Sequence, residues 1–150
     1  MNRQTFNFKI FEEVKSIAQI ADAAHIREKV FIEEQQIPAE LEFDEYDFIA
    51  THVVMYIEEI PIGTGRLLLK SDNKWYIGRI AVLKEYRGKS YGRDVVLELM
   101  RIAKNKGIKE AHIHSQVYAI PFYEKLGWKA FGEEFEEDGI QHKEMSITLN

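Results

Sequence analysis

The stretch that decides the fold is Arg87-Gly88-Lys89-Ser90-Tyr91-Gly92-Arg93, which separates an apolar run from an amphipathic run. The apolar run, 76–82, is typical of a strand, and the amphipathic run, 94–103, is typical of a helix. The stretch therefore predicts a turn from a strand into a helix N-terminus. The first amides of a helix lack partners within the helix and lie at the positive end of its dipole, and glycines let a ligand approach them closely. Such a turn can bind phosphate groups.

The local charge supports this interpretation. The segment 84–93 contains one acid, Glu85, and four basic residues, which are Lys84, Arg87, Lys89 and Arg93. The whole chain has the opposite balance, with 25 acids, 20 bases and a net charge of −5. The basic residues are therefore concentrated where the helix would begin.

Three interpretations of the turn can be compared. A nucleotide-binding P-loop needs Gly-x-x-x-x-Gly-Lys-Ser/Thr, and 88–90 supply its end, but the leading glycine would fall at Leu83. The P-loop pattern does not fit. An ordinary exposed turn between a strand and a helix is the second interpretation.

The third interpretation rests on a resemblance. Arg87-x-x-Ser90-x-Gly92 resembles Arg/Gln-x-x-Gly-x-Gly/Ala, the pyrophosphate turn of the GNAT superfamily of N-acetyltransferases. Ser90 stands where the family has its central glycine. We expect φ to be negative at Ser90, because residues with a Cβ atom are strained at positive φ.

A second motif lies downstream at the distance that the family shows. The segment 116–128 resembles Asn-x-x-Ala-x-x-x-Tyr-Glu-Lys-x-Gly-Phe, with Gln116 in place of asparagine and Trp128 in place of phenylalanine. Both replacements retain an amide or an aromatic ring. Pro121 suits the first turn of a short helix, and Gly127 suits the position just after its end.

Other segments are similar to the ElaA-like branch of the superfamily, and the resemblance covers the chain from about Ile17 onward. They are Arg27-x-x-Val30-Phe31-x-x-Glu34-Gln35, Glu42-x-Asp44-x-x-Asp47, His52, Gly63-Thr64-Gly65-Arg66-Leu67 and Gly139-Ile140-x-His142. Their order and spacing, taken together, support the assignment.

Composition agrees with one enzyme domain over 1–150, since 150 residues with 45% hydrophobic content can form one core. The chain has no cysteine, which excludes disulfides, thiolate metal sites and a cysteine nucleophile. No apolar segment reaches the ~20 residues that a membrane helix needs, and the N-terminus has no hydrophobic signal segment. We therefore expect a cytoplasmic protein. The acidic net charge argues against nucleic acid or an anionic membrane as a partner.

The periodicity predicts an α/β (α+β) sandwich. The expected elements are a strand over 6–10, a helix from a cap at Ser16 towards Phe31, an irregular acidic stretch to Asp47, a hairpin of strands over 51–57 and 64–69, a strand ending at Val82, a helix ending at Gly107, a strand over 111–115, a short helix at Pro121 and two strands around 137–139. The resemblance implies a mixed, mostly antiparallel sheet flanked by helices. In that fold the strands ending at Val82 and Ser115 splay apart, and the pantetheine arm of acetyl-coenzyme A lies between them.

The resemblance also assigns the cofactor site. Backbone groups of 80–82 would hold the pantetheine and thioester, and the amides of 88–93 the pyrophosphate. The residues predicted to bind acetyl-coenzyme A are Ile80, Ala81, Val82, Arg87, Gly88, Lys89, Ser90, Tyr91, Gly92, Arg93 and Gln116. Tyr123 matches the family tyrosine and is the predicted acid that protonates the departing thiolate. The alternative is a tyrosine that only packs.

The general base is open at this point. Glu34 follows an apolar helix end and is the first candidate, while His52, His114 and His142 are alternatives because an unperturbed imidazole titrates near ~6.5. His112 and His114 share one strand face, which could suggest a metal, but two ligands without a third are a weak signal. Direct attack by an amine needs no metal.

The segment from Val30 to Gly65 has nine acids and no lysine or arginine. Such a wall would attract a cationic amine acceptor, although a solvated acidic loop is the other interpretation. We predict an N-acetyltransferase that moves acetyl from acetyl-coenzyme A to a cationic small-molecule primary amine by direct attack in a ternary complex. A homodimer is a possible assembly. The alternative is a coenzyme A-binding sensor or interaction module without turnover.

Overall fold

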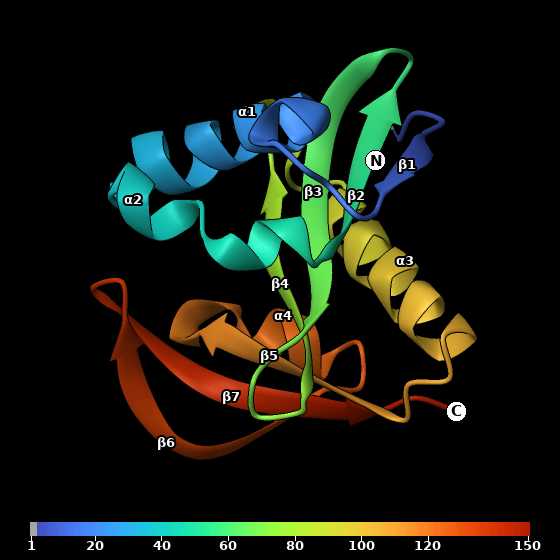
Figure 1. Ribbon diagram of the computed structural model, residues 1–150. Coiled ribbons are helices and arrows are strands. Elements are labelled where there is room, and N and C mark those ends of the chain that lie inside the picture. Colours follow the sequence, from blue (N-terminus) through green and yellow to red (C-terminus); the bar gives the residue numbers. More distant parts are fainter. Residues whose placement is uncertain (1–2) are drawn as a thin grey trace.

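The structure is a computed structural model that describes residues 3–150, and its strands form one seven-stranded sheet in the order β1-β2-β3-β4-β5-β7-β6 (Figure 1). The strands are β1 (Asn7–Phe11), β2 (Thr51–Ile57), β3 (Ile60–Leu69), β4 (Trp75–Val82), β5 (Glu110–Gln116), β6 (Lys129–Glu137) and β7 (Ile140–Thr148). The α-helices are α1 (Ala21–Arg27), α2 (Ala39–Glu42), α3 (Tyr91–Asn105) and α4 (Ile120–Glu124). Short helices of other types are η1 (Ile17–Ile20), η2 (Glu28–Glu34), η3 (Glu45–Phe48), η4 (Lys84–Tyr86) and η5 (Val117–Ala119). Within residues 3–150, no helix has the length and apolarity required to cross a membrane.

The sheet opens between β4 and β5. These two strands are parallel, whereas every other neighbouring pair is antiparallel. They pair only where Trp75 faces Ala111 and Tyr76 faces His112, and beyond these positions they diverge. The predicted splayed, mostly antiparallel sheet is therefore confirmed.

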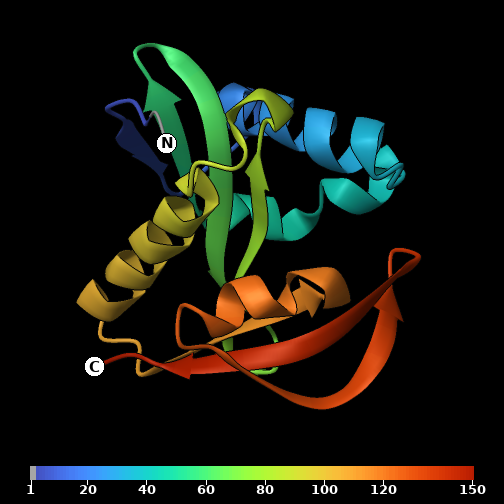
Figure 2. The same cartoon turned by 180° about the vertical axis from the view of Figure 1, so that it is seen from behind.

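Helices cover the two faces of the sheet. Helix α1 packs on β2, β3 and β4 from one face, and α3 packs on the same strands from the other. In Figure 1, α1 and α2 lie in front of the sheet, and Figure 2 shows α3 and α4 on the opposite side. We call these the α1 face and the α3 face.

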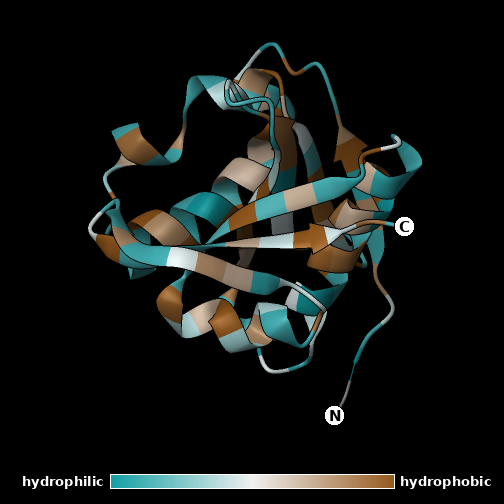
Figure 3. Cartoon of the chain, turned by 90° about the horizontal axis from the view of Figure 1, so that it is seen from below, coloured by the Kyte–Doolittle hydropathy of each residue, from teal (hydrophilic) through white to brown (hydrophobic). Residues whose placement is uncertain are grey.

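Each face has its own hydrophobic core. Met55 and Leu67 belong to the core on the α3 face, whereas Val54 and Tyr56 belong to the core under α1. Because adjacent residues of a strand point to opposite faces, β2 is buried along its whole length. Figure 3 shows hydrophobic and hydrophilic residues alternating along several of the elements.

The segment before residue 35 differs from the expected single helix. It begins as the 3₁₀ helix η1, continues as α1 and ends as the π-helix η2, in which the amide of Gln35 bonds to the carbonyl of Val30. The predicted cap by the Ser16 side chain is wrong, since that side chain makes no capping bond. Instead the Gln19 side chain accepts from the Lys15 amide at 2.6 Å.

The turn before α3 corrects a second expectation. Ser90 has φ +66° and ψ 18°, in the left-handed region, so the prediction of a negative φ is wrong. Its carbonyl accepts the first helical bond, from Asp94, at 3.3 Å. Ser90 thus has the left-handed conformation that the family's glycine adopts without strain. For serine, whose Cβ atom clashes in this region, the conformation is strained.

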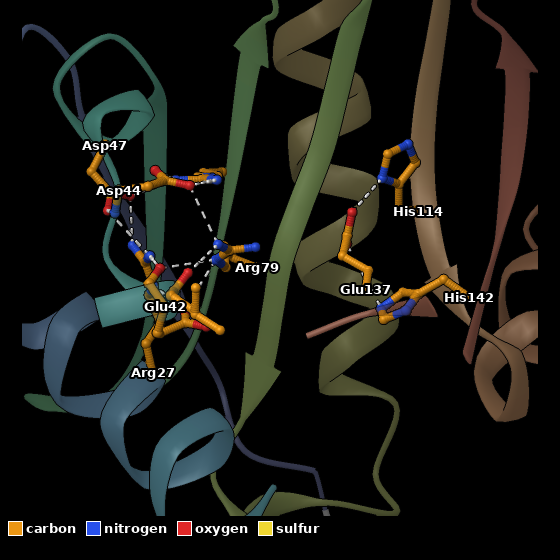
Figure 4. Close-up of polar contacts among 10 residues, drawn as sticks. Arg27, Glu42, Asp44, Asp47, Arg79, His114, Glu137 and His142 are labelled. Carbon is orange, nitrogen blue, oxygen red and sulfur yellow. Dashed lines mark hydrogen bonds and ion pairs between the residues drawn. The ribbon is translucent and has the colours of Figure 1, made fainter. Parts of the chain in front are cut away.

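The acidic stretch folds into α2 and η3 around a buried ionic cluster (Figure 4). Arg27 donates from Nε to Glu42 at 2.8 Å and from Nη1 to Asp47 at 2.8 Å. Arg66 on β3 donates to Asp47 at 2.7 Å and to Asp44 at 2.8 Å. We call this cluster, together with Arg79, the arginine–carboxylate network.

Arg79 on β4 completes the network. Its Nε lies 3.1 Å from a carboxylate oxygen of Glu42, and its Nη2 lies 3.4 Å from Asp44. Burial alone would raise the pKa of Asp47, but hydrogen bonding and charge from Arg27, with the charge of Arg66, outweigh burial and lower it to about 2. The network therefore ties the acidic segment to β3 and β4.

Ser90→Gly should stabilise the protein by about 1 kcal/mol, because glycine adopts the left-handed conformation without a Cβ clash. Chemical denaturation measures the free energy of unfolding. Ser71→Gly is the matched control, since Ser71 is an exposed turn serine without a positive φ, and glycine should not stabilise it. A destabilised Ser90→Gly variant would contradict the strain.

Asp47→Asn should destabilise the protein by about 3–5 kcal/mol at pH 7, because it removes one carboxylate partner from each of two buried arginines, Arg27 and Arg66. The lowered pKa of Asp47 stabilises the fold above the unfolded-state value of 3.8, and this contribution disappears as pH falls towards about 2. The difference between variant and unaltered protein should therefore shrink between about pH 4 and pH 2 in thermal unfolding. Glu45→Gln, at an exposed site on the same short helix, should show neither effect.

Candidate active site

The splay between β4 and β5 opens into a cavity of ≈ 150 Å³. At about 10–15 Å³ for each water-sized probe, this volume admits a small reacting group together with the end of an acceptor. Both strands line it, and further walls come from η2, the β6–β7 turn and α4. Residues used below that line it are Arg79, Ile80, His114, Gln116, Tyr123 and Glu137.

Tyr123 lies at the α3-face side of this cavity. Helix α4 begins with Pro121 in its first turn, and Gly127, at φ +98°, follows its end, as predicted. The Tyr123 ring packs edge-on against Phe122 at 4.9 Å and Trp128 at 6.2 Å. Only 7% of Tyr123 is exposed, and burial raises the pKa of its hydroxyl. The hydroxyl therefore stays protonated and can donate a proton.

A β-bulge shapes the β4 wall. Arg66 of β3 faces Gly78 and Thr64 faces Ala81, so one residue of β3 is opposed by both Arg79 and Ile80. Arg79 has φ +53°, a strained value for a residue with a side chain. Its ion pairs to the network hold this conformation. Of the predicted thioester contacts, Ile80 lines the cavity, whereas the side chains of Ala81 and Val82 are buried on opposite faces.

The predicted phosphate turn presents free amides. Within residues 3–150, no amide from Gly88 to Arg93 donates a hydrogen bond. Gly88 has φ +81° and open space around it, and Lys89 and Arg93 reach towards solvent. A run of free amides beside cationic side chains fits an anion.

Two of the turn residues have side chains in other roles. The Tyr91 ring is buried, and its hydroxyl accepts from the Gln4 amide at 2.7 Å, so only its backbone faces the turn. A Cβ at Gly92 would meet Val82 at 3.7 Å and Phe122 at 3.8 Å, which are ordinary contacts. The packing around Gly92 therefore does not itself require a glycine.

Arg87 and Glu34 form a bidentate ion pair with N–O distances of 2.8 and 2.9 Å. Arg87 also donates from Nε to the Val82 carbonyl at 2.9 Å. Glu34 does not line the cavity with Tyr123 and instead borders a groove with Lys84. The structure thus brings the predicted base to the phosphate turn, and its role in catalysis stays a prediction.

Gln116 ends β5 and reaches across to η2. Its Nε2 donates to Oε1 of Gln35 at 2.9 Å, so the amide of Gln116 bonds a side chain at the end of η2. Both glutamines line the cavity. Gln35 belongs to the ElaA-like segment but carried no predicted role.

The histidines fall into separate environments. His52 is 1% exposed and donates from Nε2 to the Asp47 carbonyl at 2.8 Å, and burial lowers its pKa. His114 and His142 line the cavity, with Glu137 between them (Figure 4). His112 lies outside the cavity and bonds Glu144 at 3.1 Å.

The prediction that the acids of the segment 30–65 form a wall that attracts a cationic acceptor is wrong for three residues. Glu42, Asp44 and Asp47 belong to the arginine–carboxylate network, so their charges are compensated by arginines and cannot attract an acceptor strongly. Glu40 of the same segment is exposed. Glu42, Glu137 and Asp138 all line the cavity, and of these Glu137, to which the sequence analysis gave no role, bonds His114.

The structure places a buried phenol in a cavity between two splayed strands, near a turn whose amides are free. Comparison with known proteins supports the family resemblance seen in the sequence. Residues 15–149 match the family described as acetyltransferase (GNAT) domain. The Bacillus subtilis protein named uncharacterized N-acetyltransferase YjcF is 38% identical over 132 residues, covering 87% of this chain and 94% of the relative.

Solved structures show the same architecture. A Lactobacillus plantarum protein assigned as an N-acetyltransferase superposes with a TM-score of 0.86 and 30% identity, covering 98% of this chain and 100% of the other. Escherichia coli ElaA has a TM-score of 0.84 and 22% identity, covering 95% and 99%, and so shares the fold. With its family match, its relatives and its fold in agreement, the chain belongs to the GNAT family of acetyltransferases and is an acyltransferase.

Proposed function

We propose that this protein transfers an acetyl group from acetyl-coenzyme A to a primary amine, by direct attack in a ternary complex. The observation that carries the proposal is the position of the buried Tyr123 side chain in the wall of the cavity between β4 and β5. Acetyl-coenzyme A held between β4 and β5 would place its thioester sulfur within reach of the Tyr123 hydroxyl. We further propose that the chain acts as one domain in the cytoplasm.

The residues present fit the cofactor. The free amides of Gly88 to Arg93 suit a pyrophosphate, and Lys89 adds a nearby cation. Backbone groups along the unpaired edge of β4, around Ile80 and Val82, suit the amide-bearing pantetheine arm. When bound, acetyl-coenzyme A supplies the activated acyl group.

Tyr123 would act as the acid. As the carbon–sulfur bond breaks, the thiolate needs a proton, and a buried phenol with a raised pKa holds one at neutral pH. Gln116 and Gln35, joined across the cavity, would fix the position of the acyl arm. The acceptor is a small-molecule amine, and its protonated form suits the carboxylate of Glu137, which lines the cavity.

Tyr123→Phe should lower kcat by roughly 10²–10⁴-fold while the Kd for coenzyme A stays the same, because only proton donation is lost. Thiol release with a panel of primary amines measures turnover, and calorimetry measures binding. Tyr56→Phe is the control, since it removes a phenol that bonds Asp22 away from the cavity. Full turnover by Tyr123→Phe would show that the ring only packs. Coenzyme A binding without turnover by the unaltered protein would favour the non-catalytic module instead.

Removing Arg87 and Lys89 together, as alanines, should weaken coenzyme A binding and flatten its dependence on salt. Exposed charges act on phosphates within a Debye length of ~10 Å at 0.1 M salt. Replacing Lys104 and Lys109, exposed near the other end of α3, removes the same charge and should leave affinity unchanged. If both double variants weakened coenzyme A binding equally, the net charge of the protein, and not the phosphate turn, would explain the effect.

A further inference from the structure

The α1 face of the cavity carries a cluster of titratable groups that the proposed chemistry has not yet used. Ile113 belongs to the core on the α3 face, so its neighbour His114 points to the α1 face. His114 comes from β5, Glu137 from the end of β6 and His142 from β7 (Figure 4). Tyr123 packs in the α3-face core, so the two groups approach the cavity from opposite faces of the sheet.

The His114 ring is held in one orientation. Its Nδ1 lies 3.0 Å from Oε1 of Glu137, and the edges of the Tyr76 and Phe135 rings pack on it at 5.2 and 5.0 Å. A carboxylate can only accept, so Nδ1 carries the proton and Nε2 keeps a lone pair. Within residues 3–150, Nε2 of His114 has no hydrogen-bond partner, and the side chain is 24% exposed.

Two of the other candidates for a base are engaged outside this cavity, and the third, His142, shares the cavity with His114. Both carboxylate oxygens of Glu34 accept from Arg87, outside this cavity. His52 is buried against the Asp47 carbonyl. The Nδ1 of His142 donates to the Ile140 carbonyl at 2.7 Å, and its Nε2 faces Glu137 at 3.9 Å.

We propose that His114 is the general base that deprotonates the acceptor amine, which enters from the α1 face, and that Glu137 is its positioning residue. This inference rests on the proposed acetyl transfer and adds the identity of the base and the side of attack. The substrate class is a primary amine that arrives as an ammonium ion, because Glu137 and the imidazole both accept from cations.

The proton balance follows from the two faces. Nε2 of His114 takes one proton from the ammonium, and the free amine forms the carbon–nitrogen bond to the thioester carbonyl. The tetrahedral intermediate collapses, the carbon–sulfur bond breaks, and Tyr123 gives its proton to the sulfur. After the carbon–nitrogen bond has formed, the nitrogen loses a second proton, and this proton restores the Tyr123 hydroxyl. The first proton, on Nε2 of His114, leaves to solvent. The products are the amide, the free thiol and one proton.

The surroundings keep Glu137 ionised. The hydrogen bond from His114, with the charges of His142 and Lys70, lowers the pKa of Glu137 although burial opposes the change. Tyr76 on β4 also packs against His114, and its hydroxyl donates to Asp72 at 2.8 Å and not to the imidazole. An ionised Glu137 holds the Nδ1–H tautomer and stabilises the imidazolium that forms during transfer.

The chain offers a matched test, because β5 carries two histidines on one face, each bonded to a glutamate. His114→Gln should lower kcat/KM by roughly 10²–10⁴-fold, with the same Kd for acetyl-coenzyme A, and the loss should shrink at high pH where the amine loses its proton unaided. His112→Gln should keep kcat/KM within about threefold, since His112 bonds Glu144 outside the cavity.

Glu137→Gln tests the positioning role without removing the base. It should lower kcat/KM and move the acid limb of the pH profile to lower pH, because a neutral amide no longer stabilises the imidazolium. Glu144→Gln, its counterpart beside His112, should leave the limb in place.

The outcomes separate the two proposals. Amine acetylation by His114→Gln at the unaltered rate and with the unaltered pH profile would overturn the role of His114 alone. An acid limb that Glu137→Gln leaves unmoved would overturn the positioning role. Coenzyme A binding by the unaltered protein with no acetylation across the amine panel would overturn the acetyl transfer itself.

Discussion

The structure depends on one constraint, which is that β4 and β5 stay paired for only two residue pairs. Beyond Tyr76 and His112, each strand has a row of backbone groups without a neighbouring strand. Such edges normally attract another strand or are covered. Here both edges border the same cavity. The bulge at Arg79 bends the β4 wall away from β5, so the opening persists without a loop to hold it.

The two faces of the sheet carry different groups around the cavity. The α3 face holds the apolar core, the start of α3 with its free amides, and Tyr123. The α1 face holds the ionic groups, which are the arginine–carboxylate network on the β3–β4 side and His114 with Glu137 on the β5 side. An acyl carrier from one face and an acceptor from the other would meet in the splay without competing for space.

Local features were predictable because neighbours in sequence determine them. Pro121 and Gly127 marked the ends of α4, a hairpin pattern marked β2 and β3, alternation marked β5, and the family motifs led to the splay. The conformation of Ser90 was not predictable in the same way. The residue type favours negative φ, and the turn as a whole overrides that preference.

Ion pairs between residues far apart in the sequence could not be predicted. The segment 30–65 has no lysine or arginine, yet Arg27, Arg66 and Arg79 reach its acids from both flanks. Likewise Glu34 meets Arg87 across 53 positions, and His114 meets Glu137 across 23. No periodicity links such positions, and only the folded chain brings them together.

The arginine–carboxylate network has a consequence for how such a protein can diverge. Arg27, Arg66 and Arg79 balance Glu42, Asp44 and Asp47, so the cluster is electrically neutral as a whole while every member is charged. Losing one member strands an opposite charge in the interior, whereas replacing a complete set of partners by apolar residues is often tolerated. These six positions should therefore be inherited as a block. A homologue that lacks one of them should lack its partner too, while the loops around the block drift freely.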